Sequence, residues 1–157
     1  MLENIVAEIY AGALSIEKAM AEADVPTCGA LTLFAGRVRN NHQGQDVTGM
    51  TYDMHQPLAL KTLQDIAAEA LREAAGSKIY LAHAHGELAI GDVSVVIAVA
   101  SPHRGEGYQA SRYIIEEIKT RLPVWKREHY TNGKSDWLPG HSLTQSRTQP
   151  RAQSEGR

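Results

Sequence analysis

Two apolar runs decide the fold: KIYLAHAH at residues 78–85 and VSVVIAVA at residues 93–100. Between them lies GELAIGD at residues 86–92, where two glycines and an aspartate favour a turn. Short apolar runs that are bounded by turn residues are typical of buried strands. We therefore expect the two runs to form an antiparallel strand pair.

Working outward from this pair, the pattern predicts helices on both sides of it. A helix is expected over Tyr108–Arg121, because three isoleucines recur there at helical spacing before Pro123 stops it. Another runs from Pro57 to Ala75, and a short one begins after Ser15, a typical N-cap, and stops before Pro26. The remaining expected elements are strands at Asn4–Tyr10, Ala30–Val38, Val47–His55 and Val124–Tyr130, with a polar, mobile loop at Asn40–Asp46.

This order of elements predicts an α+β fold, with a mostly antiparallel sheet and helices packed against it. At Asn4–Tyr10 a strand is favoured over a short helix, because apolar and polar residues alternate. We place a single domain at residues 1–141. Residues 142–157 have almost nothing to bury and are interpreted as a disordered tail.

Composition narrows the class of protein. The chain has 157 residues, 43% of them hydrophobic, which suits one domain with a real core. With 16 basic and 18 acidic residues the net charge is −2, which argues against a nucleic-acid-binding surface. A single cysteine, Cys28, permits no internal disulfide. We expect no membrane association, because there is no secretory signal and the longest apolar run is too short to span a bilayer, and a reducing cytoplasm fits best.

The positively charged residues are unevenly distributed along the sequence. Three groups stand at the ends of expected elements: Arg37 with Arg39, His103 with Arg104, and Lys119 with Arg121, Lys126 and Arg127. In a chain of slightly negative net charge, such groups favour a converging pocket for an anion, although solvated surface charge is the simpler interpretation of any one of them. Lys119 falls in the last helical turn, where the helix dipole favours its protonated form.

Three other patterns receive less weight. GEGYQA at residues 105–110 matches a dinucleotide-binding pattern, but the antiparallel pair before it is wrong for that fold. His83 and His85 share a strand face and could ligate a metal, yet no third ligand is identifiable, so we expect no metal site. Cys28 is more consistent with a small buried hydrophobe than with a nucleophile.

Four stretches carry a family resemblance when they are taken in order. They are FAGRVRN at 34–40, GEL at 86–88 with GD at 91–92, HR at 103–104, and KTRLPVWKRE at 119–128. In this order and spacing, from about Gly29 to Trp137, they resemble the large, catalytic subunit of molybdopterin synthase. Two features depart from the family pattern: the strand at Tyr52–His55 is atypical, and only His141 precedes Arg147 where a cation could reach across a dimer.

The resemblance implies a hammerhead-type α+β fold and a homodimer that binds a small ubiquitin-like subunit at each end, forming a heterotetramer. The C-terminal Gly-Gly thiocarboxylate of that partner would supply the sulfur that converts cyclic pyranopterin monophosphate into dithiolene-bearing molybdopterin. No cofactor is implied for this subunit. The implied substrate-binding residues are Arg37, Val38, Arg39, His103, Arg104, Lys119, Lys126, Arg127 and Glu128.

Elementary chemistry agrees with this assignment. Because the phosphate and the thiocarboxylate are both anionic, a site that joins them needs several fixed cations. We expect His103 and Arg104 to hold phosphate and Arg39 to orient the pterin, with Lys119 and Lys126 as the catalytic proton donors. The alternative is a non-catalytic module that binds a phospholigand or a protein tail. It leaves the two lysines unexplained, since arginine alone is the better planar anion clamp.

Overall fold

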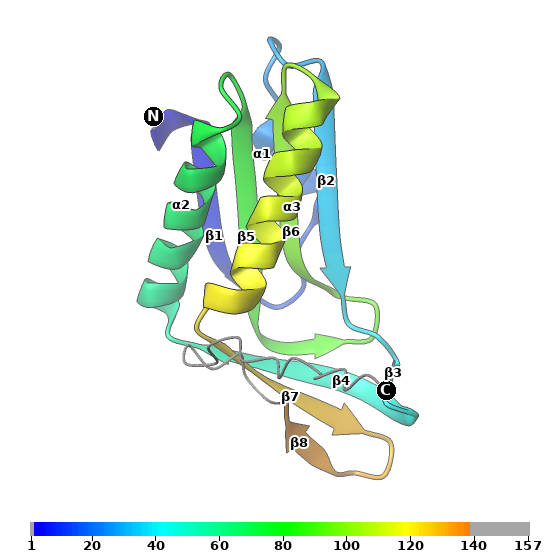
Figure 1. The fold of residues 1–157 in the computed structure, drawn as a ribbon. Helices are drawn as coiled ribbons and strands as arrows, with labels where there is room; N and C mark the ends of the chain where they lie inside the picture. The colour runs from blue at the N-terminus through cyan, green and yellow to red at the C-terminus, as the bar shows by residue number, and fades with distance from the viewer. Residues whose placement is uncertain (1, 139–157) are drawn as a thin grey trace, which may run out of the picture.

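The computed structural model describes residues 2–138, which fold into three helices and a sheet of eight strands (Figure 1). The first half contains β1 (Ile5–Ala11), α1 (Ile16–Ala23), β2 (Ala30–Arg37), β3 (Asn41–His42), β4 (Gln45–Met54) and α2 (Gln56–Arg72), after a 3-10 turn at Leu2–Asn4. The second half contains β5 (Lys78–Ala89), β6 (Val93–Ser101), α3 (Arg104–Arg121), β7 (Val124–Tyr130) and β8 (Ser135–Trp137). The predicted tail at 142–157 lies outside the described residues.

The predicted antiparallel pair of β5 and β6 is confirmed, with Leu81 opposite Ile97. The strand order is β2-β6-β5-β4-β7-β8, with β3 paired antiparallel to β4, while β1 pairs with β5 in parallel. Every other pairing is antiparallel, so the expected mostly antiparallel α+β fold is confirmed.

β5 is longer than expected and joins two layers of strands. Its first part lies between β1 and β6, and after Gly86, whose φ is +85°, it pairs with β4 instead. A positive φ is easily adopted only by glycine, which explains the bend at this point. In Figure 1, β4, β7 and β8 consequently lie across the end of the upright strands β1, β5, β6 and β2.

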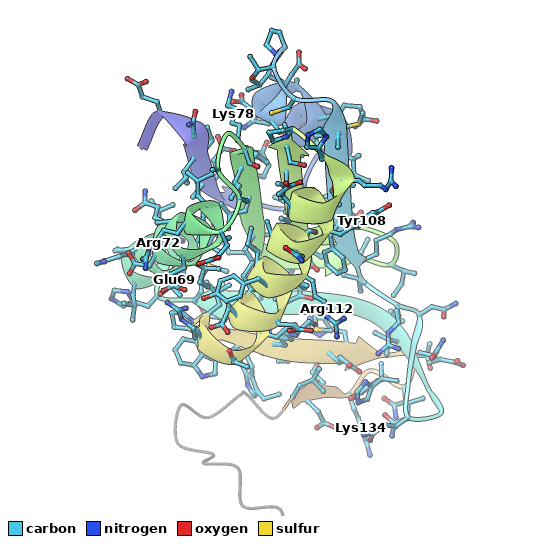
Figure 2. All side chains as sticks on the ribbon, turned by 45° about the horizontal axis from the view of Figure 1, so that its top comes forward. Glu69, Arg72, Lys78, Tyr108, Arg112 and Lys134 are labelled. Carbon is cyan, nitrogen blue, oxygen red and sulfur yellow. The ribbon has the colours of Figure 1, made fainter. Side chains whose placement is uncertain are left out.

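The core lies on both faces of the upright strands. On one face α2 and α3 pack onto the sheet, with Leu63, Ile66 and Ile114 fully buried, and on the other α1 contributes Ala19 and Ala23. Because both faces are covered, every residue of β6 is buried. The outer faces of α2 and α3 carry charged side chains such as Arg72 and Arg112 (Figure 2).

The ends of several elements differ from expectation; α2, for example, ends at Arg72 rather than at Ala75. Two of the differences change how a segment is interpreted. The segment 40–46, predicted to be a mobile loop, is instead a tight β3–β4 hairpin whose turn residues Gln43 and Gly44 have φ of 47° and 78°. α3 begins at Arg104, four residues before the predicted start. Gly107 therefore lies within the helix, where a Cβ would stand 2.5 Å from the Thr32 Oγ1 atom, so its role is close helix–sheet packing.

Candidate functional site

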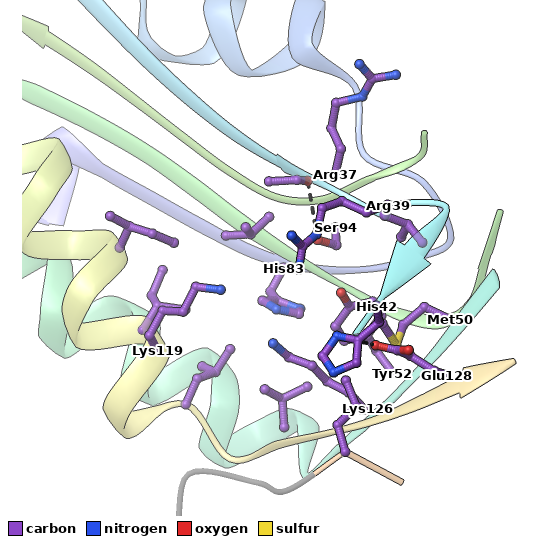
Figure 3. A pocket seen from close by; sticks show the side chains of 18 of the residues that line it. Arg37, Arg39, His42, Met50, Tyr52, His83, Ser94, Lys119, Lys126 and Glu128 are labelled. Atoms are coloured by element: carbon purple, nitrogen blue, oxygen red, sulfur yellow. Dashed lines mark hydrogen bonds and ion pairs between the residues drawn. The ribbon is translucent and has the colours of Figure 1, made fainter. Parts of the chain in front are cut away.

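A cavity of about 290 Å³ lies where the C-terminal end of α3 meets the crossing strands β4 and β7 (Figure 3). Four cationic side chains from three parts of the chain line it: Arg37, Arg39, Lys119 and Lys126. Val38 and Glu128 also contribute to the wall. The structure thus brings together six of the nine residues that the sequence nominated.

The two arginines lie next to a local irregularity at the end of β2, and the side chain of Arg37 extends away from Lys119 and Lys126 (Figure 3). The register with β6 shifts between Gly36 and Arg37, and the Arg37 Nε donates to the Gly91 carbonyl at 2.9 Å. Val38 then exchanges backbone hydrogen bonds with the β5–β6 turn, donating to Asp92 at 3.0 Å and accepting from Gly91 at 2.8 Å. These contacts hold the chain that carries Arg39 against the turn.

Lys126 is held in a largely buried position by the pairing of β7 with β4, opposite Tyr52. Burial lowers the pKa of Lys126, the positive charge of Lys119 lowers it further, and Glu128 opposes both effects. Lys119 approaches from the last turn of α3. Among residues 2–138, neither lysine amine takes part in an ion pair.

Glu128 supplies the buried negative charge of the site. Its side chain is only 4% exposed, and its Oε1 lies 3.2 Å from the Nδ1 of His42. The other oxygen, Oε2, is buried without a hydrogen-bond partner in the described structure. Since such an oxygen is costly to leave unpaired, it marks a place where an N–H or O–H donor of a ligand would be stabilised.

Three nominated residues are not among those that line the cavity. Arg127 alternates with Lys126 and Glu128 along β7, so it faces the opposite side, where its guanidinium lies 5.2 Å from the centre of the Trp137 ring. His103 and Arg104 stand at the start of α3. Because Lys119 falls in its last turn, the helix separates Arg104 from Lys119 by about 22 Å.

Among the lining residues that were not nominated as substrate ligands are His83 and Tyr52, whose ring centroids lie 5.3 Å apart in an edge-to-face contact. Strand alternation could have indicated His83, since it shares a face with the core residues Ile79 and Leu81. Among the residues described, no group of three or more His, Cys, Asp or Glu could hold a metal ion. Cys28 lies outside the cavity lining, and its thiol donates to the Gly76 carbonyl at 3.3 Å.

Several cationic donors line one cavity, so the arrangement suits an anionic ligand and can donate protons to it. All four cations are donors only, whereas His83 and Glu128 are among the lining side chains that can accept. Within the described range, no helix is long and apolar enough to cross a membrane.

Comparisons with known proteins agree on one family. A family model described as MoaE protein matches residues 9–121. The chain is 46% identical over 121 residues to the molybdopterin synthase catalytic subunit of Synechococcus elongatus, covering 76% of this chain and 73% of the relative. It is 37% identical to molybdopterin synthase catalytic subunit 1 of Mycobacterium tuberculosis, covering 80% of this chain and 84% of the relative.

Solved structures agree as well. The crystal structure of molybdopterin synthase from Staphylococcus aureus matches with a TM-score of 0.80 and 33% identity, covering 84% of this chain and 96% of that one. A complex of subunits 1 and 2 of molybdopterin-converting factor from Helicobacter pylori shares the fold, with a TM-score of 0.67 and 24% identity over 83% and 88% of the two chains. These matches support the enzyme rather than the non-catalytic binding module. The chain therefore belongs to the MoaE protein family, that of the molybdopterin synthase catalytic subunits, which transfer sulfur in molybdopterin biosynthesis.

Proposed function

We propose that the cationic cavity is where this sulfurtransferase joins two anions, the thiocarboxylate of a small ubiquitin-like partner and cyclic pyranopterin monophosphate. The observation that carries the proposal is that Lys119, Lys126 and Arg39 line one cavity together with Arg37, whose guanidinium is held at the Gly91 carbonyl. Two anionic reactants repel each other, and fixed cations in a water-poor site offset that repulsion. The sulfur arrives on the partner, so Cys28 needs no part in the reaction.

Lys119 and Lys126 are the catalytic residues of this proposal. The pKa of Lys126 is lowered towards neutral pH, so its ammonium is a better proton donor than that of an ordinary lysine. Lys119 stabilises the negative charge that develops near the transferring sulfur. Arg39 orients the pterin, and the unpaired Oε2 of Glu128 accepts a hydrogen bond from it.

His103 and Arg104 hold the substrate phosphate only if they belong to a second copy of the chain. Within one subunit neither residue is among those that line the cavity, and α3 places Arg104 about 22 Å from Lys119. We therefore propose that the homodimer places these two residues, from one subunit, at the cavity of the other. Arg127 faces away from the cavity and serves substrate binding indirectly, by bracing β7 through its contact with Trp137.

The small partner inserts its Gly-Gly tail into the cavity, and one partner on each subunit completes a heterotetramer. The solved Helicobacter pylori assembly of two subunits supports such a pairing. Light scattering of the chain, alone and with the partner, tests it. A monomeric mass under both conditions would contradict the dimer and the trans role of His103.

We also propose that the domain ends at residue 141 and that the protein works in the cytoplasm.

Turnover with thiocarboxylated partner and the cyclic pterin tests the central proposal. Lys126→Ala should lower the rate by about 100- to 10,000-fold, the usual contribution of a positioned proton donor. Lys119→Ala should lower it by about 100- to 1,000-fold, the usual effect of removing one charge-stabilising donor. Lys61→Ala is the matched control, because Lys61 pairs with Asp65 on the exposed face of α2 and should leave turnover unchanged. Full activity of both folded cavity variants would refute the proposal.

A further inference from the structure

The floor of the cavity contains a buried histidine to which the proposed chemistry gives no role. His83 is 4% exposed and lines the same cavity as Lys119 and Lys126. In Figure 3 its ring lies among the amine ends of these two lysines. Ile79 and Leu81 precede it on the same face of β5 and belong to the aliphatic core. An imidazole thus takes the next position on that face, where the core gives way to the cavity.

The protonation of the ring follows from its contacts. The Nδ1 of His83 lies 2.7 Å from the carbonyl oxygen of Ala84, and because a carbonyl only accepts, Nδ1 carries the proton. Burial, together with the charges of Lys126 and Lys119, lowers the pKa of His83 to about 4, so the ring is neutral near pH 7. The other nitrogen, Nε2, is then a hydrogen-bond acceptor. The edge contact with Tyr52 further restrains the ring plane.

The Lys126 amine needs such an acceptor. An ammonium has three N–H donors, and a largely buried one is stabilised only when acceptors face it. Lys126 is the more strongly coupled of the two lysines to His83, since its charge has the larger effect on the imidazole. A neutral imidazole can accept from this ammonium without repelling it.

We propose that His83 is a positioning residue, whose Nε2 accepts a hydrogen bond from the Lys126 ammonium and directs that amine at the reacting groups. The inference rests on the proposed catalytic role of Lys126. The ionisable groups that face the imidazole are Lys119 from α3, Lys126 from β7 and Tyr52 from β4. The bond from Nδ1 to Ala84 presents a lone pair, rather than an N–H, to the cationic side of the cavity.

A double-mutant cycle on turnover tests this coupling. His83→Leu removes the acceptor and should lower kcat by about 10- to 100-fold, the range for a hydrogen bond to a charged group, while KM for the pterin changes less than about threefold. His83→Gln places an amide oxygen near the Nε2 position and should restore most of the rate. In a Lys126→Met background, His83→Leu should have no further effect.

The pKa of Lys126, followed by NMR of protein labelled with ¹³C at the lysine ε-carbon, gives a second readout without turnover. It should fall in His83→Phe, which keeps a ring but lacks the acceptor, and stay near the wild-type value in His83→Gln. His83→Phe also replaces His83→Leu in the kinetic cycle should the leucine variant not fold.

A wild-type kcat in a folded acceptor-free variant, an equal loss in the Lys126→Met background, or an unchanged lysine pKa would each overturn the inference. Full activity of Lys126→Met would instead refute the proposed catalytic role of Lys126, and the NMR measurement would still decide whether His83 contacts the amine.

Discussion

The buried imidazole should make the stability of the whole domain depend on pH in a window set by one residue. The pKa of His83 is about 4 in the folded chain, against 6.5 for an ordinary histidine. Between these values the unfolded chain binds a proton that the folded chain does not, so stability falls as the pH falls. The contribution of the neutral His83 ring to the unfolding free energy is complete above about pH 6.5 and is lost progressively as the pH falls towards 4.

The size of the effect follows from the same two pKa values. Going from pH 7.5 to pH 5.0, protonation of His83 in the unfolded chain should cost about 2 kcal/mol of unfolding free energy. For a domain whose total stability is about 5–15 kcal/mol, this is a measurable fraction.

Urea unfolding at the two pH values, for wild type and for His83→Gln, isolates the effect. All other titrating groups are shared by the two proteins, so their contributions cancel in the comparison. The wild type should lose about 2 kcal/mol more than His83→Gln on acidification. An equal loss in the two proteins would show that the imidazole is not held neutral, and would refute the reasoning from its burial.

Three further changes have expected outcomes in thermal or urea unfolding. Glu69→Gln should lower the unfolding free energy near neutral pH, because hydrogen bonds from Arg121 hold the pKa of Glu69 at about 2 in the folded chain. As the pH falls from about 4.5 towards 2 this stabilisation is lost, so the unfolding free energies of variant and wild type should converge. A constant difference between the two proteins over this pH range would contradict the prediction. Gly107→Ala should cost about 1–3 kcal/mol, since its Cβ would meet a hydroxyl at 2.5 Å, whereas Gly105→Ala, with nothing within 4 Å, should be neutral or stabilising; equal effects would show that the helix can shift. Ile114→Ala should cost about 2–5 kcal/mol because the side chain is fully buried, and a loss below 1 kcal/mol would mean that the core relaxes around the cavity.

Much of the fold could be predicted from local pattern. The β5–β6 hairpin, the isoleucine stripe of α3 and the Ser15 cap, whose Oγ accepts from the Lys18 amide at 3.1 Å, are all as expected. Such features depend on neighbours within a few residues. The passage of β5 into the second layer depends on a pairing with β4 that lies far away in the sequence, so periodicity could not show it.

The candidate site divides along similar lines. Lys126 and Glu128 share a face because they are two residues apart, and the same alternation turns Arg127 away. The convergence of His103 with Arg37 was expected because both follow strands. However, β2 and β6 are antiparallel, and the first residue of β2, Ala30, pairs with the last residue of β6, Ser101. The C-terminal ends of the two strands therefore point in opposite directions along the sheet. Sequence position at a strand end therefore indicates proximity only when strand direction is known.

The cavity is closed by segments from widely separated parts of the chain, with Arg37 near the end of β2 and Lys126 in β7. While the chain is being synthesised, β5, β6 and α3 can assemble before β7 has been made. Lys126 is then not yet in place. Long-range closure of this kind comes late in folding because it carries the largest loop-closure entropy. Sulfur-transfer competence would then report on complete folding, and a half-made subunit could not consume the thiocarboxylate of its partner unproductively.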